Sequence, residues 1–249
     1  MSFYDELAPM YDELTGQASR AEAVGQFCDR LVQTSRPAAA LDAACGTGAY
    51  ARALARKDVQ VTGADLSGAQ LAQARKLAHR QGLAIEWVQS AFVDLPQRTD
   101  GQFDLVLCMG NSLVHVMQPE GLAGALDAFF HVLAPGGVFI TTNLNYEKIC
   151  SRSERIVGVD RNADRQFIRF YDFHSPERIA FNVLRIDWQG QSAETELYTT
   201  QLRPWQPDQL AAAMREAGFI DVRSFGGLDF SPFDPAVSDV LLLQGRKPQ

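Results

Sequence analysis

The sequence has few of the features that mark nucleic-acid-binding or membrane proteins. Lysine and arginine (23 residues) are outnumbered by aspartate and glutamate (30), which gives a net charge of −7 at pH 7. A protein that binds a phosphate backbone needs clustered basic residues, so this balance argues against nucleic acid as a partner. No apolar run approaches the roughly 20 residues needed to span a bilayer, so we expect no membrane insertion.

Cysteine is also scarce. The four cysteines, Cys28, Cys45, Cys108 and Cys150, are far apart and form no C-x-x-C pair. This spacing argues against zinc ribbons and iron–sulfur chemistry, and we expect no metal site. The first residues are acidic and lack the apolar core of a secretory signal. The sequence therefore predicts a cytoplasmic protein with reduced thiols.

Hydrophobic residues are plentiful, at 46% of the chain, and they fall into an alternation of strands and helices. Parallel strands need crossover connections, and right-handed helical crossovers cover both faces of the sheet. Five short apolar runs predict parallel strands of this kind: Ala38–Ala43, Val59–Ala64, Ile85–Val88, Phe103–Met109 and Val138–Thr142.

The pattern changes after about residue 150. Antiparallel strands are predicted at Gln166–Phe173, Ile179–Trp188 and Ala193–Leu202. A helix over Pro207–Ala217 and two closing strands, Phe219–Ser224 and Asp239–Arg246, complete the chain. The segment between about 150 and 205 is therefore a β insertion in an α/β domain.

The strongest local signal is the segment Leu41–Gly48, which reads L-D-A-A-C-G-T-G. Its glycines let the backbone turn tightly after the first strand and approach a ligand closely. Asp42 places a carboxylate beside this turn, where it suits the cationic end of a zwitterion better than a pyrophosphate. Asp65 ends the second strand, and a carboxylate there can accept hydrogen bonds from both hydroxyls of a ribose.

The segment Gly46–Ala51 also fits the dinucleotide pattern G-x-G-x-x-G/A, so an NAD(P)-dependent oxidoreductase is an alternative. The short-chain form of that class needs a tyrosine followed four residues later by lysine. None of the six tyrosines has this lysine.

Leu41–Gly48, Asp65 and Leu133–Gly137 together resemble the class I S-adenosylmethionine-dependent methyltransferases. The resemblance implies a doubly wound, seven-stranded Rossmann-like sheet with the last strand antiparallel. The antiparallel β insertion would lie before the sixth strand. It also implies S-adenosyl-L-methionine as the cofactor.

Three short motifs, Ser19–Glu22, Met109–His115 and Asn145–Glu147, resemble the glycine N-methyltransferase branch. By this resemblance Arg20 holds the cofactor carboxylate and Tyr11 closes over the methionine moiety. Asn111 and Tyr146 are the implied substrate contacts. The full set of expected cofactor contacts is Tyr11, Arg20, Asp42, Ala44, Gly46, Gly48, Asp65, Leu66, Ala91, Phe92 and Met109.

Two positions depart from the pattern of that branch. Ala91 stands where an Asp or Asn usually holds the adenine amino group, so adenine would rest on backbone amides and stack against Phe92. Leu144 replaces the arginine that binds the substrate carboxylate, which argues against glycine itself as the acceptor.

The resemblance predicts methyl transfer to a small molecule, at an amine nitrogen. An oxygen acceptor would need a base, and His115 is the candidate, so O-methylation stays an alternative. A protein that binds S-adenosylmethionine without catalysing a reaction is a further alternative.

We expect one domain over 1–249, with an N-terminal flap and helix (1–34) and a cofactor-binding core (35–145). The β insertion (150–205) would act as a substrate lid, followed by a closing segment (206–249).

Overall fold

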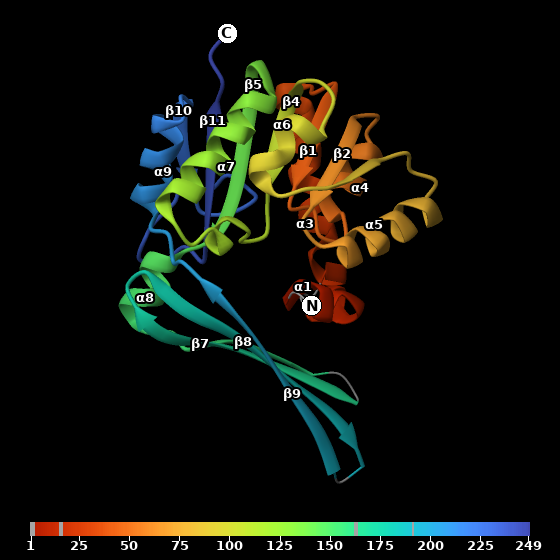
Figure 1. Ribbon diagram of the computed structural model, residues 1–249, viewed down its shortest axis with the longest axis vertical. Coiled ribbons are helices and arrows are strands. Elements are labelled where there is room, and N and C mark those ends of the chain that lie inside the picture. Colours follow the sequence, from red (N-terminus) through yellow and green to blue (C-terminus); the bar gives the residue numbers. More distant parts are fainter. Residues whose placement is uncertain (1–2, 15–16, 162–163, 191) are drawn as a thin grey trace.

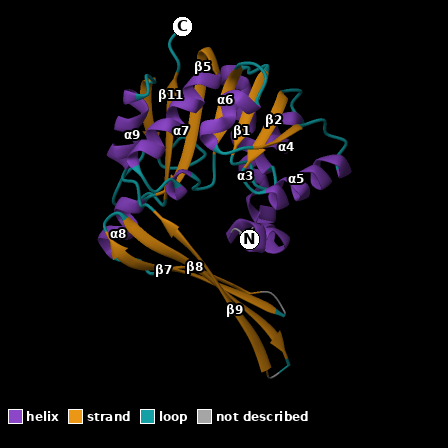
Figure 2. Ribbon diagram, in the orientation of Figure 1, coloured by secondary structure: helices purple, strands orange, loops and turns teal. Residues whose placement is uncertain are grey.

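The computed structural model describes residues 3–14, 17–161, 164–190 and 192–249, and its strands form two separate sheets (Figures 1 and 2). The larger sheet has seven strands in the order β10-β11-β5-β4-β1-β2-β3. Neighbours among β1 to β5 run parallel, whereas β11 is antiparallel to both β5 and β10. The bounds are β1 Ala39–Ala43, β2 Gln60–Asp65, β3 Glu86–Gln89, β4 Phe103–Cys108, β5 Leu133–Leu144, β10 Ile220–Phe225 and β11 Val240–Arg246. The predicted fold class is confirmed, including the antiparallel last strand.

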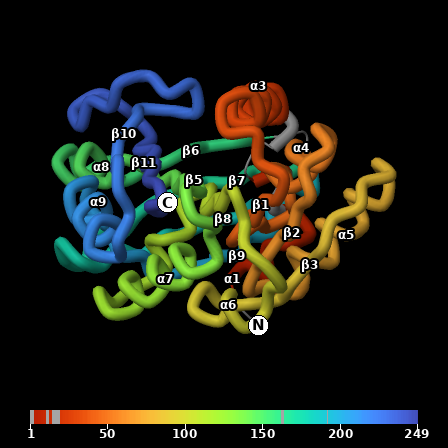
Figure 3. Tube along the Cα trace, turned by 90° about the horizontal axis from the view of Figure 1, so that it is seen from above, coloured from red at the N-terminus to blue at the C-terminus, as the bar shows by residue number. Residues whose placement is uncertain are grey.

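Helices cover both faces of this sheet (Figure 3). The apolar sides of α3 and α4 pack on one face, and those of α7 and α9 pack on the other. The helix bounds are α1 Phe3–Leu7, α2 Tyr11–Leu14, α3 Gln17–Ser35, α4 Ala49–Ala55, α5 Gly68–Arg80, α6 Leu95–Arg98, α7 Pro119–Val132, α8 Tyr146–Arg152 and α9 Pro207–Glu216. With both faces covered, the functional surface is left to the ends of the strands.

The helices next to the strand ends begin where the sequence supplies a cap. Ser67 caps α5, and its hydroxyl accepts a hydrogen bond from the backbone N–H of Gln70 at 3.2 Å. Pro119 occupies the first position of α7, where its missing N–H costs nothing. The capping-box pattern Ser19–Glu22 predicts a helix that opens at Ser19, whereas α3 begins two residues earlier at Gln17.

The smaller sheet is antiparallel, in the order β6-β7-β8-β9, and projects from the end of the larger one (Figure 1). Its strands are β6 Ile156–Arg161, β7 Arg165–Ser175, β8 Arg178–Gln189 and β9 Ser192–Leu202. The sequence predicted the last three strands but missed β6. This edge strand is exposed along nearly its whole length, so it lacks the alternation of apolar and polar residues that marks a half-buried strand.

The fifth strand is longer than predicted. β5 begins at Leu133 and includes Pro135-Gly136-Gly137, which we expected to separate the helix from the strand. The backbone of Gly136 has a φ of 76°, and the register between β4 and β5 shifts in this region. The Pro-Gly-Gly sequence is therefore an irregular first part of the strand.

The N-terminal helices lie between the two sheets (Figure 1). Leu7 and Leu14 are buried there in a cluster with side chains of the smaller sheet, among them Phe167 and Val183. The Asp5 carboxylate also accepts a hydrogen bond from the Ser67 hydroxyl at 2.5 Å, which joins α1 to the start of α5. Among the described residues, no helix is both long and apolar enough to cross a membrane.

Candidate active site

Two cavities lie at the carboxyl ends of the parallel strands, next to α1. The first, of about 360 Å³, is lined by the residues that follow β1, β2 and β3. The second, of about 380 Å³, is lined by the ends of β4 and β5, by α3 and by the smaller sheet. Phe3, Tyr4, Gly110 and His115 line both cavities. A ligand in the first cavity and a ligand in the second can therefore meet at these four residues.

The glycine-rich turn after β1 has an unusual backbone. Ala44, Gly46 and Gly48 all have positive φ angles, of 65°, 55° and 79°. Ala44 and Gly46 line the first cavity, as expected of ligand contacts. Gly48 is not among the lining residues; it precedes α4 and lies against the indole of Trp87. Its place in the motif is thus explained by packing and backbone conformation.

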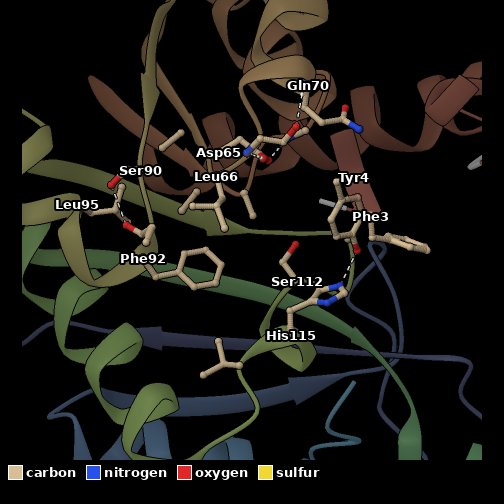
Figure 4. A pocket seen from close by; sticks show the side chains of 18 of the residues that line it. Phe3, Tyr4, Asp65, Leu66, Gln70, Ser90, Phe92, Leu95, Ser112 and His115 are labelled. Carbon is tan, nitrogen blue, oxygen red and sulfur yellow. Dashed lines mark hydrogen bonds between the residues drawn. The ribbon is translucent and has the colours of Figure 1, made fainter. Parts of the chain in front are cut away.

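Asp65 is held rigidly at the end of β2, on the wall of the first cavity (Figure 4). Its Oδ2 accepts a hydrogen bond from the Gly46 N–H and its Oδ1 one from the Ser67 N–H, both at 2.8 Å. Burial raises the pKa of this carboxyl, while the two backbone N–H groups lower it. The carboxylate ties the glycine-rich turn to the start of α5, and its other lone pairs remain for a ligand.

Asp42, in contrast, lies within the sheet and lines neither cavity. Its Oδ2 accepts a hydrogen bond from the Ala51 N–H at 3.0 Å, and its Oδ1 is buried without a partner among the described residues. Burial raises the pKa of Asp42 to about 7. Through this hydrogen bond the carboxyl group stabilises the first turn of α4.

Asp42→Asn is expected to make folding stability less dependent on pH. The pKa of Asp42 is higher in the folded chain than the roughly 3.9 of an unfolded one, so folding takes up a proton and stability falls as the pH rises from about 4 to about 7. Asparagine keeps the acceptor for the Ala51 N–H but cannot ionise. Urea unfolding at pH 5 and pH 8 should show the variant losing less stability, by on the order of 2 kcal/mol. Equal losses in the two proteins would contradict the shift.

The far part of the first cavity has an apolar wall. Ala91 and Phe92 line it after β3, and Leu66 lines it after β2 (Figure 4). Gln70 also lines this cavity, and neither amide atom has a partner among the described residues although the side chain is only 1% exposed. Gln70 was not among the residues expected in the site.

His115 stands where the two cavities join. Its Nε2 lies 2.5 Å from the hydroxyl of Tyr4, so the N-terminal helix reaches the centre of the site (Figure 4). Burial lowers the pKa of His115 to about 4, so the ring is neutral at pH 7 and can accept a hydrogen bond. Tyr4 was not among the expected site residues, although the sequence Tyr-Asp-Glu-Leu occurs twice in this segment, at Tyr4 and at Tyr11.

The two predicted substrate contacts, Asn111 and Tyr146, are brought together by the fold. The Asn111 amide donates to the Tyr146 hydroxyl at 2.8 Å and accepts from the Leu144 N–H at 3.0 Å. Asn111 lines the second cavity, whereas Tyr146 is fully buried behind it and also contacts Tyr171. Burial raises the pKa of Tyr171 to about 12, and that of Tyr146 is also raised. This network holds the loop after β4 against β5.

The remaining expected cofactor contacts are spread over the site. Arg20 lines the second cavity on α3, near Tyr50. Met109 is buried at the end of β4 and accepts a hydrogen bond from the Ser112 hydroxyl through its carbonyl. The side chain of Tyr11 lies outside the described part of the structure.

The known proteins to which this chain is similar are methyltransferases. The sequence profile of a family described as a methyltransferase domain matches residues 40–137. A glycine/sarcosine N-methyltransferase of Halorhodospira halochloris is 26% identical over 228 residues, which cover 90% of this chain and 81% of that protein. A ubiquinone biosynthesis O-methyltransferase of Pseudomonas aeruginosa (strain LESB58) is 29% identical over 194 residues, which cover 77% of this chain and 68% of that protein. A solved S-adenosylmethionine-dependent methyltransferase from Clostridium acetobutylicum ATCC 824 superposes over 100% of both chains with a TM-score of 0.82 at 17% identity.

The chain carries a methyltransferase domain, and its fold is that of the S-adenosylmethionine-dependent methyltransferases. The prediction of an enzyme of this class is confirmed, and S-adenosylmethionine is the cofactor of the methyltransferase. The nicotinamide-dependent alternative is set aside. The relatives include both N- and O-methyltransferases, so the acceptor has to be argued from the site itself.

Proposed function

We propose that this methyltransferase transfers the methyl group of S-adenosylmethionine to an amine nitrogen of a small molecule bound in the second cavity. The observation that carries the proposal is the composition of the cavity wall. Two arginines, Arg20 and Arg169, line the second cavity, and its described lining residues include no carboxylate. Without a carboxylate in this lining an ammonium ion finds no anionic partner there, and burial favours the neutral, nucleophilic form of a bound amine.

The first cavity suits the adenosine part of the cofactor. Asp65 would accept hydrogen bonds from the ribose hydroxyls, and Phe92 would stack on the adenine between Leu66 and Ala91. The unpartnered amide of Gln70 and the positive φ angles of the glycine-rich turn are further features that fit a polar ligand at this place. Arg20 would hold the carboxylate of the methionine part in the second cavity.

S-adenosylmethionine would supply an electrophilic methyl carbon bonded to a sulfonium, and the neutral thioether S-adenosylhomocysteine would be the leaving group. The residues of the chain then have mainly to position the nucleophile in line with the breaking bond, which can contribute roughly 7–11 kcal/mol. Tyr4, Gly110 and His115 surround the junction of the cavities, where the methyl group would be presented. The Tyr4–His115 hydrogen bond joins α1 to this junction.

His115 is poorly suited to the role that O-methylation would require. With a pKa of about 4, the imidazole is a weak base and removes a proton from a hydroxyl inefficiently at neutral pH. A neutral amine needs no base before it attacks, and the product can lose its proton afterwards. The low basicity of His115 therefore favours nitrogen over oxygen as the atom that accepts the methyl group.

The proposal predicts which acceptors the enzyme methylates and what His115 contributes. S-adenosylhomocysteine release should be measured with amines and with their hydroxyl analogues of the same carbon skeleton. Amines should be turned over, and His115→Ala should lower the rate by less than roughly tenfold because no general base is lost. Activity confined to phenols or carboxylic acids, with a loss of roughly 10²- to 10⁴-fold in His115→Ala, would show O-methylation instead.

A further inference from the structure

Arg169, on β7, carries a guanidinium from the smaller sheet to the wall of the second cavity. Arg169 pairs in register with Gly158 of β6, and its guanidinium lies against this glycine. A Cβ at position 158 would collide with the guanidinium. One nitrogen, Nη2, pairs with the Asp160 carboxylate at 2.5 Å. The Nε is buried and has no hydrogen-bond partner among the described residues. Glycine at position 158 thus allows the arginine to lie along the sheet with a donor unused.

Asn143, on β5, has a second unused polar group on the same cavity. Its side chain is 2% exposed, and neither its Nδ2 nor its Oδ1 has a partner among the described residues. A buried amide without hydrogen bonds is unfavourable unless a ligand supplies them. Asn143 directly precedes Leu144, and both line the second cavity.

The two arginines of the cavity belong to different surroundings. Arg20 and Tyr50 line the cavity at the side formed by α3 and α4. Arg169 and Tyr171 line it at the side formed by the smaller sheet, where both belong to β7. In the proposed function Arg20 serves the cofactor carboxylate. Arg169 is then left for the acceptor.

We propose that Arg169 and Asn143 bind an anionic group of the acceptor, a carboxylate or a phosphate. This inference rests on the proposed methylation of an amine, and it names the second functional group of that amine. A guanidinium with free N–H groups binds either anion through charge-assisted hydrogen bonds, and the Asn143 amide adds a further donor. The acceptor is therefore an amine that also carries a negative charge.

The position of Arg169 explains how the enzyme can bind such an acceptor although residue 144 is a leucine. The cationic group comes from β7 of the smaller sheet instead of from the end of β5. Arg203 is not available for this role, because its guanidinium donates to the Met117 carbonyl, pairs with Glu177 and packs on Trp205. A cavity of about 380 Å³ also leaves room for an acceptor larger than glycine.

The test is anion binding to the full-length enzyme saturated with S-adenosylhomocysteine. Acetate, inorganic phosphate and neutral acetamide are titrated by calorimetry at constant ionic strength. Wild-type enzyme should bind acetate or phosphate and not acetamide, and the preferred anion tells whether the acceptor is a carboxylate or a phosphate. Arg169→Gln should weaken the binding at least roughly tenfold, as expected for a lost charge-assisted hydrogen bond. Arg169→Lys should be intermediate, and Asn143→Leu should also bind more weakly.

Arg161→Gln is the matched control, since it removes the same charge from an exposed position of the same sheet. Its anion affinity should equal that of the wild type, and all variants should keep their affinity for S-adenosylhomocysteine. Absence of anion binding by the wild type, or equal binding by Arg169→Gln, overturns the inference. Anion binding that depends on Arg169 in an enzyme that methylates only hydroxyl acceptors would refute the proposed amine methylation and leave the anion site standing.

Discussion

Replacing Asp65 by alanine is expected to weaken binding of S-adenosylhomocysteine by roughly 10- to 150-fold, or about 1.5–3 kcal/mol. The carboxylate lines the first cavity at the end of β2, where it can accept from the hydroxyls of the ribose. It also accepts from the backbone N–H groups of Gly46 and Ser67. Alanine thus removes both the ligand contact and the support for the turn on which the ligand rests.

Calorimetry with the product decides this prediction without any knowledge of the acceptor. Asp94→Ala is a suitable control, because Asp94 is an exposed carboxylate just after β3 that lines neither cavity. Asp65→Asn keeps an acceptor oxygen without the charge and should fall between the wild type and Asp65→Ala. A folded Asp65→Ala variant with an unchanged dissociation constant would remove Asp65 from the cofactor site.

The larger sheet could be predicted from the sequence because its central strands are buried on both faces. β1, β2 and β4 therefore appear as short continuous apolar runs, each bounded by turns or helices. β6 could not be found in this way, since solvent reaches nearly all of its side chains and nothing constrains their polarity. Arg169, on the neighbouring β7, lines the second cavity, and its sequence context does not indicate this.

The candidate site was predictable where a motif ends a strand. Ala44, Gly46, Asp65, Ala91 and Phe92 follow β1, β2 and β3, and all of them line the first cavity. Their role as cofactor contacts remains a prediction. The position of each follows from the topology, because parallel strands end at one edge of the sheet.

Gln70 and Asn143 could not be predicted in the same way. What distinguishes them is burial without a hydrogen-bond partner, and this depends on which atoms other elements bring near. In the sequence Gln70 reads as an ordinary residue at the start of a helix, and Asn143 as a polar residue at a strand end. Only the packed structure shows that these amides have no hydrogen-bond partner among the described residues.

Gly48→Ala is expected to destabilise the fold by about 2–5 kcal/mol. Two causes contribute: a left-handed backbone, which costs about 1–2 kcal/mol for a residue with a side chain, and overpacking, which costs about 1–3 kcal/mol. The φ of Gly48 is 79°, and a Cβ there would lie 2.5 Å from Cη2 of the Trp87 ring. Because the same ring also lies against Gly63, it has little room to move away.

Two other glycines separate these causes. Gly82 has a φ of 64° and nothing within 4 Å of a Cβ, so Gly82→Ala measures the backbone strain alone. At Gly63 a Cβ would lie 2.5 Å from the Trp87 ring in ordinary strand backbone, so Gly63→Ala measures the overpacking alone. Urea unfolding should show Gly48→Ala to be the least stable of the three variants. Adding Trp87→Leu should relieve the overpacking cost in Gly63→Ala, and only part of the total cost in Gly48→Ala. If Gly48→Ala were no less stable than Gly82→Ala, the indole would be free to shift, and Gly48 would be required only for its backbone conformation.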